Sequence, residues 1–154
     1  MLPMPFHVAR QAPLTDFVAW CVTLVFIALG LWHFRMAFWA GPGGGAVPSV
    51  EGKPLFVPST RATVSVGVVL LLFAGLVAAT GRLVEVRASP QILSWLSLAL
   101  ALGLLARSIG EFKYVGFFKR VRGSRFARLD TWIYSPLCLL LALGVALVAM
   151  RNGV

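Results

Sequence analysis

Four long apolar runs constrain the fold of this chain more than any other feature. They cover residues 17–39, 62–80, 91–112 and 131–150. Each is close to the roughly 20 residues that an α-helix needs to cross the hydrocarbon of a bilayer. None alternates apolar and polar residues as a barrel strand does, and lipid admits only helices or closed barrels as spanning structures. The sequence therefore predicts an all-α integral membrane bundle of four transmembrane helices, forming a single domain over residues 1–154.

Composition argues against a soluble domain of this length. Hydrophobic residues make up 59% of the chain and charged residues 12%, against about 45–50% and 25% in soluble domains. The formal net charge of +9 would suggest nucleic acid in a soluble protein. Here the charges separate apolar runs, which favours anionic membrane lipids as partners. Because nucleic-acid motifs and zinc-ligand spacings are absent from the sequence, we predict no nucleic-acid partner, no metal site and no cofactor.

Basic residues are distributed unevenly between the two sides of the predicted bundle. The connectors at 40–61 and 113–130 share one side and hold about twice as many Lys and Arg residues as the other side. Cytoplasmic connectors carry such an excess of basic residues. We therefore expect a multi-pass protein of the bacterial inner membrane, with both larger connectors in the cytoplasm and both termini outside it.

Several residues indicate where the helices begin and end. Gly81 follows the second run, and Ser89 with Pro90 precedes the third as an N-cap and first helical residue. Asp130 can cap the fourth helix, for which Pro136 predicts a kink one turn inside. A fourth helix that begins only at Pro136 is the alternative, but it would be short for a span.

Polar side chains gather at one depth of the predicted bundle. At about 1.5 Å per residue, seven of them fall near the cytoplasmic interface, while the outer leaflet has almost no ionisable group. We treat these seven as candidate binding residues and assign no catalytic residue: His33, Arg35, Arg107, Glu111, Tyr114, Asp130 and Tyr134.

The third helix is expected to present part of this group on one face. Gly103, Arg107, Gly110, Glu111 and Tyr114 recur at spacings of three and four residues. Arg107 and Glu111 are then i,i+4 partners that can form an ion pair, and the glycines allow a neighbouring helix to approach closely. The pair can be structural, handle protons or anchor a ligand. Asp130 is most simply a helix cap, and His33 either forms an interfacial hydrogen bond or transfers a proton.

The segment 113–130 alternates basic and aromatic residues. Such a segment can lie in the headgroup layer, with its aromatic rings toward the acyl chains and its cations against anionic lipid. A topology signal alone is the simpler interpretation, and the two are compatible. The predicted lipid contacts are Lys119, Arg120, Arg122, Arg125 and Arg128.

The same region resembles the signature of a known family. The matching residues are Arg107 to Lys119, Phe126-Ala127, Asp130-Thr131 and the segment from Tyr134 to Leu139, with weaker likeness around Trp32-His33 and in the Gly/Pro-rich connector. Together they resemble a family of small bacterial membrane proteins, number 3995 among the domains of unknown function. The resemblance implies a four-helix membrane protein with its signature on the cytoplasmic side, and it transfers no catalytic residue.

Three functional classes remain open at this stage. The first is a non-enzymatic accessory module that binds a lipid or a partner on its cytoplasmic face, within a larger membrane complex or a homo-oligomer. The second is a membrane enzyme acting on a lipid or quinone-like substrate, with Glu111 or His33 as acid and base. The third is an oligomeric transporter or channel, for which the apolar outer leaflet offers no polar path. We favour the first class.

Overall fold

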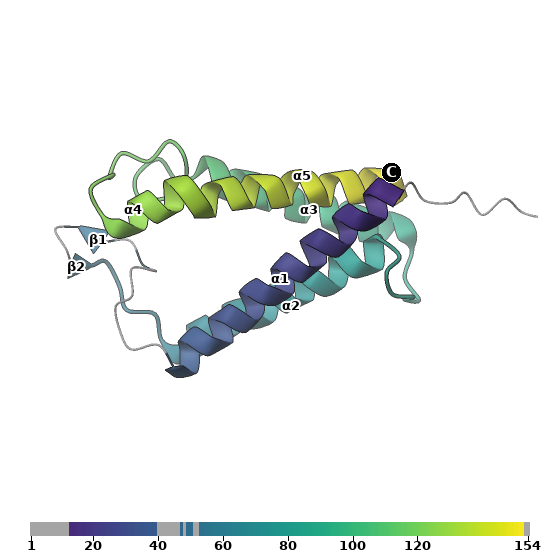
Figure 1. Cartoon of the computed structure of the whole chain (residues 1–154), viewed down its shortest axis with the longest axis horizontal. Helices are drawn as coiled ribbons and strands as arrows, with labels where there is room; N and C mark the ends of the chain where they lie inside the picture. The colour runs from purple at the N-terminus through teal and green to yellow at the C-terminus, as the bar shows by residue number, and fades with distance from the viewer. Residues whose placement is uncertain (1–12, 40–46, 48, 51–52, 153–154) are drawn as a thin grey trace, which may run out of the picture.

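The computed structural model describes residues 13–39, 47, 49–50 and 53–152, and their regular secondary structure is helical apart from one short ladder (Figure 1). Strands β1 (Ser49–Val50) and β2 (Lys53–Pro54) pair antiparallel, with Ser49 opposite Pro54. The helices are, in chain order, α1 (Pro13–Trp39), α2 (Thr60–Thr80), α3 (Pro90–Ile109), α4 (Arg125–Leu129), the π-helix η1 (Asp130–Tyr134) and α5 (Ser135–Asn152).

Four helical segments of the described chain are long and apolar enough to cross a membrane. They are α1, α2, α3 and a continuous fourth segment, Arg125–Asn152, built from α4, η1 and α5. Large apolar side chains point outward along all four, among them Leu24, Leu72, Leu102 and Leu140, each more than half exposed. Outward apolar faces fit a bundle surrounded by acyl chains. The predicted all-α fold with four candidate spans is therefore confirmed.

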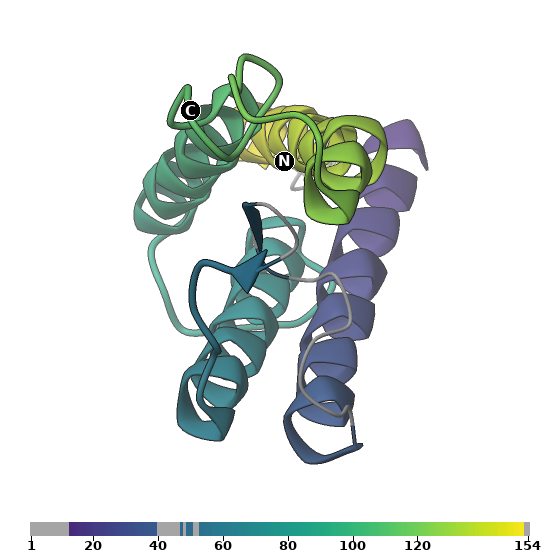
Figure 2. The same cartoon turned by 90° about the vertical axis from the view of Figure 1, so that its left-hand side faces the viewer.

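The four spans form two arms. Helix α1 packs along α2, and α3 packs along α5, with fewer contacts between the pairs. The arms meet at the end where α1 begins and α5 finishes, and they diverge toward the end that carries β1, β2 and α4 (Figures 1 and 2). We call the first the terminal end and the second the loop end.

The shared core lies toward the terminal end. Its buried members come from all four spans: Val22, Phe26, Ala74, Val77, Ala101, Leu141 and Val145. Close to this core the Thr80 hydroxyl lies 2.8 Å from the Ser97 hydroxyl and also donates to the Leu76 carbonyl oxygen at 2.9 Å. These bonds satisfy buried hydroxyls that would otherwise be unpaired in an apolar interior. The terminal end is thus the part of the molecule where the two arms are held together.

Glycines bring two helices together only at particular positions. A Cβ built on Gly67 would lie 2.8 Å from the Phe34 ring and 3.1 Å from the Gly30 carbonyl oxygen, so α1 and α2 approach closely there. A Cβ on Gly103 would meet nothing within 4 Å. The prediction that Gly103 admits a neighbouring helix is therefore wrong.

The predicted signals at the end of α2 and the start of α3 are confirmed, with two differences in geometry. Gly81 terminates α2 with φ −75°, and the left-handed residue is Arg82 at φ +56°. The Leu83 amide closes this turn by donating to the Ala78 carbonyl oxygen at 2.8 Å, as in a Schellman ending. Ser89 precedes Pro90 at the start of α3, but its hydroxyl donates to the Gln91 side chain instead of capping the helix.

The fourth span begins earlier than expected. Its first residue is Arg125, and the Ser124 hydroxyl caps it by accepting from the Ala127 amide at 3.1 Å. Asp130 therefore lies inside the helix, and its predicted role as the cap is wrong. The irregularity expected at Pro136 takes the form of the π turn η1 just before it, in which the Ser135 amide donates to the Asp130 carbonyl oxygen. The wider turn accommodates the proline ring without ending the helix.

Candidate functional site

A buried carboxylate at the loop end organises the candidate site. The Asp130 side chain is completely buried. One of its oxygens, Oδ1, accepts from Arg107 Nη2 at 2.8 Å. The other, Oδ2, accepts from the Gly116 amide at 2.7 Å and from Lys119 Nζ at 3.0 Å. Asp130 thus ties α3, the connector after α3 and the fourth span to one another. We call Arg107, Lys119 and Asp130 the Asp130 cluster.

Lys119 is the second buried charge of the cluster. Its ammonium donates to the Asp130 carboxylate, to the Gly116 carbonyl oxygen at 2.9 Å and to the Thr131 hydroxyl at 2.6 Å. These three acceptors match the three N–H groups of an ammonium. The Thr131 hydroxyl in turn donates to the Ala127 carbonyl oxygen at 3.0 Å. A fully buried lysine is tolerated only when it is paired and hydrogen-bonded in this way.

Two glycines let the connector between α3 and α4 fold back onto Asp130. Gly110 and Gly116 both have φ +90°, a region that side-chain-bearing residues rarely adopt. Their backbones touch: a Cβ on Gly110 would lie 1.8 Å from the Val115 carbonyl oxygen, and one on Gly116 would lie 2.3 Å from that of Ile109. This crossing presents the Gly116 amide and the Lys119 side chain to the carboxylate.

Backbone hydrogen bonds hold the rest of this connector in place. The Phe117 amide donates to the Ser108 carbonyl oxygen at 3.0 Å, and the Arg120 and Val121 amides donate to the carbonyl oxygens of Phe112 and Lys113. The connector is therefore an ordered cap on the loop end of the α3–α5 arm, anchored by the Asp130 cluster.

The cluster carries more positive than negative charge. Arg107 and Lys119 contribute two positive charges and Asp130 contributes one negative charge, a formal balance of +2 − 1 = +1. The surplus resides on the arginine, whose side chain is 36% exposed while those of Lys119 and Asp130 are fully buried. Arg107 Nη1 is itself buried and has no hydrogen-bond partner among the described residues. The arrangement therefore leaves Nη1 of the arginine without an acceptor, beside a carboxylate that accepts three hydrogen bonds.

The predicted Arg107–Glu111 ion pair is wrong. Helix α3 ends at Ile109, and Gly110 turns the chain away, so Glu111 does not follow Arg107 by one helical turn. Glu111 is exposed, and both ion pairs within the described residues are made by Asp130. Tyr114, expected on the same helical face, lies in the connector with Lys113 Nζ 5.0 Å from its ring centre.

His33 and Arg35 do not join the Asp130 cluster. They lie on α1, whose loop end diverges from the α3–α5 arm (Figure 1). His33 Nδ1 is 2.8 Å from the Leu29 carbonyl oxygen of the same helix, and the Arg35 guanidinium lies 5.3 Å from the Trp32 ring centre. The seven candidate residues thus form no common site. Tyr134 lies near the cluster in sequence, but its ring packs against Phe126 at 6.0 Å.

The predicted lipid-contact residues divide into two groups. Lys119 is buried in the Asp130 cluster, so its predicted lipid contact is wrong. The other four, Arg120, Arg122, Arg125 and Arg128, are exposed. Lys119 was misplaced because it sits between exposed Phe118 and exposed Arg120, and local sequence gives no sign that it turns inward.

The chemistry of the cluster is that of a structural anchor with one free donor. Asp130 already accepts three hydrogen bonds, two of them from cations. Among the described residues, His, Cys, Asp and Glu side chains do not gather in any group of three or more that could hold a metal ion.

Comparison with known proteins places the chain in a family. Neither curated proteins nor solved structures give a match. One family model, described as a protein of unknown function (DUF3995), matches residues 26–145. The match runs from the middle of α1 into α5 and includes Arg107, Lys119 and Asp130. With most of its length matched, and with the four apolar helices that the resemblance implied, this chain belongs to the DUF3995 family.

Proposed function

We propose that this protein is a non-enzymatic module of the bacterial inner membrane that binds anionic lipid through a basic surface at its loop end. The observation that carries the proposal is which charged residues of the segment 113–130 are paired and which are exposed. Its one acidic residue, Asp130, forms ion pairs with Arg107 and Lys119 inside the cluster. The arginines at 120, 122, 125 and 128 are exposed and make no ion pair within the described residues.

Exposed aromatic side chains accompany these arginines. Phe118 is 62% exposed and Phe112 is 54% exposed in the connector, and their rings lie 6.5 Å apart. Trp132, two residues after the cluster aspartate, is 80% exposed. Aromatic rings are common where a membrane protein crosses the headgroup layer, and cations beside them meet anionic lipid. The Asp130 cluster supports this surface by holding the connector in one conformation.

Neutralising the exposed arginines tests the proposal. The triple variant Arg120→Gln, Arg125→Gln and Arg128→Gln avoids Arg122, whose Nε donates to the Lys119 carbonyl oxygen. Each basic residue near a membrane surface contributes about 1 kcal/mol toward anionic lipid. We therefore expect the number of phosphatidylglycerol molecules retained beyond the first to fall at least about tenfold on the variant after extraction from vesicles of phosphatidylglycerol and phosphatidylcholine, measured by native mass spectrometry.

A matched triple variant controls for the change in net charge. Arg82→Gln, Arg87→Gln and Arg151→Gln remove the same charge from exposed positions at the terminal end, and this variant is expected to retain phosphatidylglycerol as the unmodified protein does. Equal retention by both variants would show that the loop-end surface does not select anionic lipid.

We also propose that the loop end faces the cytoplasm. The segments 53–61 and 113–130 at this end contain most of the basic residues, including Arg61, Lys113 and Arg120, while Arg82, Arg87 and Arg151 lie at the other end. A C-terminal alkaline phosphatase fusion is expected to be active and a C-terminal green fluorescent protein fusion dark, because α5 ends at the terminal end. The reverse pattern would place the arginines outside and contradict the orientation.

The acid–base alternative is not supported by the geometry. It needs Glu111 or His33 beside a cavity, but Glu111 is exposed in the connector after α3, and His33 Nδ1 lies 2.8 Å from the Leu29 carbonyl oxygen of its own helix. The two residues also belong to arms that diverge at this end (Figure 2).

A further inference from the structure

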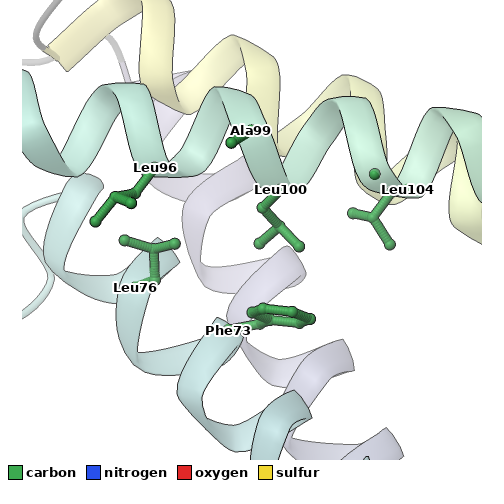
Figure 3. A pocket seen from close by; sticks show the side chains of 7 residues that line it. Phe73, Leu76, Leu96, Ala99, Leu100 and Leu104 are labelled. Atoms are coloured by element: carbon green, nitrogen blue, oxygen red, sulfur yellow. The ribbon is translucent and has the colours of Figure 1, made fainter.

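An apolar groove runs between the two arms. It has a volume of about 490 Å³ and is formed by Phe73 and Leu76 of α2 and by residues of α3 (Figure 3). The α3 residues are Leu96, Ala99, Leu100, Gly103 and Leu104. Gly103 deepens the groove, because a Cβ at this position would meet nothing within 4 Å. The groove therefore has room for an apolar chain.

Helical register places Arg107 about one turn beyond the residues that line this groove, toward the loop end. It follows Gly103 by four residues and Leu104 by three, so its backbone lies on the same face of α3, about 5–6 Å further along the axis. From Leu96 to Arg107 the helix rises about 16 Å, close to half of the roughly 30 Å of hydrocarbon in a bilayer. This face of α3 is thus as long as one acyl chain of a phospholipid. The Arg107 guanidinium lies at the depth of that lipid's headgroup.

The charge of the Asp130 cluster indicates the charge of the headgroup that a lipid in this groove would carry. The cluster has a formal charge of +1, and its surplus lies on Arg107, whose side chain is 36% exposed. An uncompensated cation at the edge of a low-dielectric region is stabilised by an anion, and guanidinium binds phosphate oxygens especially well. Lys119 cannot supply this contact, because its N–H groups already have acceptors.

We infer that the α2–α3 groove holds an acyl chain of an anionic phospholipid whose phosphate is bound by Arg107. This site is distinct from the proposed surface of Arg120, Arg125 and Arg128, because it places one lipid between the arms instead of many around the loop end. The lipid fills the space between α2 and α3 and supplies the negative charge that the cluster lacks.

Filling the groove with a side chain tests its occupancy. Gly103→Leu places a branched apolar group in the groove, whereas Gly75→Leu adds the same group to α2 at another exposed position where a Cβ also meets nothing within 4 Å. Both variants are reconstituted in equal phosphatidylglycerol and phosphatidylcholine, extracted in mild detergent and examined by native mass spectrometry. In the Arg120→Gln, Arg125→Gln, Arg128→Gln background, which removes the proposed loop-end surface, we expect the chain with Gly103 and the Gly75 variant to retain one phosphatidylglycerol. The Gly103 variant is expected to retain about tenfold less, as when about two methylene groups lose their contacts.

A second variant tests the headgroup. Arg107→Gln leaves a one-to-one pair between Lys119 and Asp130 and is expected to keep a lipid in the groove but lose its preference for phosphatidylglycerol over phosphatidylcholine. The inference is overturned if the Gly103 and Gly75 variants retain equal lipid, if the groove holds a second copy of the chain without lipid, or if Arg107→Gln keeps the preference. Arg120→Gln, Arg125→Gln, Arg128→Gln should retain this one lipid, so failure here and failure of the proposed surface give different results.

Discussion

Replacing Asp130 by Asn should lower the free energy of unfolding by about 3–5 kcal/mol, the loss typical of breaking a buried ion pair from one side. The change leaves the fully buried Lys119 ammonium and the Arg107 guanidinium without a counter-charge, and it weakens the bond to the Gly116 amide. Thermal unfolding in detergent, followed by intrinsic tryptophan fluorescence or circular dichroism, measures the effect as a lower Tm.

Two control variants make this prediction specific to the cluster. Glu111→Gln removes an exposed carboxylate that forms neither of the two ion pairs, and such surface changes stay within about 0.5 kcal/mol. The Tm of Arg107→Gln is expected to lie between those of Asp130→Asn and Glu111→Gln, because Lys119 and Asp130 remain paired. A Tm for Asp130→Asn that equals the Tm for Glu111→Gln would show that the cluster does not stabilise the fold.

Gly110→Ala is expected to disrupt the connector between α3 and α4 altogether. Gly110 has φ +90° and ψ −179°, a region essentially confined to glycine, and a Cβ there would lie 1.8 Å from the Val115 carbonyl oxygen. The neighbouring atoms are backbone, so the crossing of Gly110 and Gly116 must open. The expected loss exceeds about 4 kcal/mol, the range of the most damaging single substitutions.

Gly123→Ala is the matched control for this substitution. Gly123 lies in the same connector, its φ is not positive, and a Cβ there would meet nothing within 4 Å. Limited proteolysis should cleave the Gly110→Ala variant rapidly after the basic residues of the connector and spare the Gly123→Ala variant. Equal resistance of both variants would mean that the connector does not need the backbone crossing.

The four spans could be predicted from the sequence because length and hydropathy alone determine whether a helix crosses a bilayer. Ends marked by local residues were also predictable, such as Gly81 and Ser89-Pro90. The splay of the two arms was not, because every span is apolar around most of its circumference. No stripe on a helix then indicates which neighbour it contacts.

The candidate site was predicted only in part, and its errors have one physical origin. Arg107 and Asp130 are both predicted site residues, but helical spacing pairs Arg107 with Glu111, which fails once Gly110 ends α3, and Asp130 is predicted only as a helix cap. Lys119 was grouped with its exposed neighbours because a run of basic residues does not show which one turns inward. These contacts join residues 11 and 23 positions apart, and only the tertiary fold brings them together.

The π turn at Asp130–Tyr134 determines which way the cluster carboxylate faces. An extra residue in one turn shifts the angular phase of a helix by about 100° relative to a regular α-helix. The angle about the helix axis between Asp130 and the lipid-facing side of α5 therefore differs from the angle in a uniform α-helix. A single inserted or deleted residue in this short stretch would rotate the carboxylate away from Arg107 and Lys119 while leaving the hydrophobic character of the span unchanged.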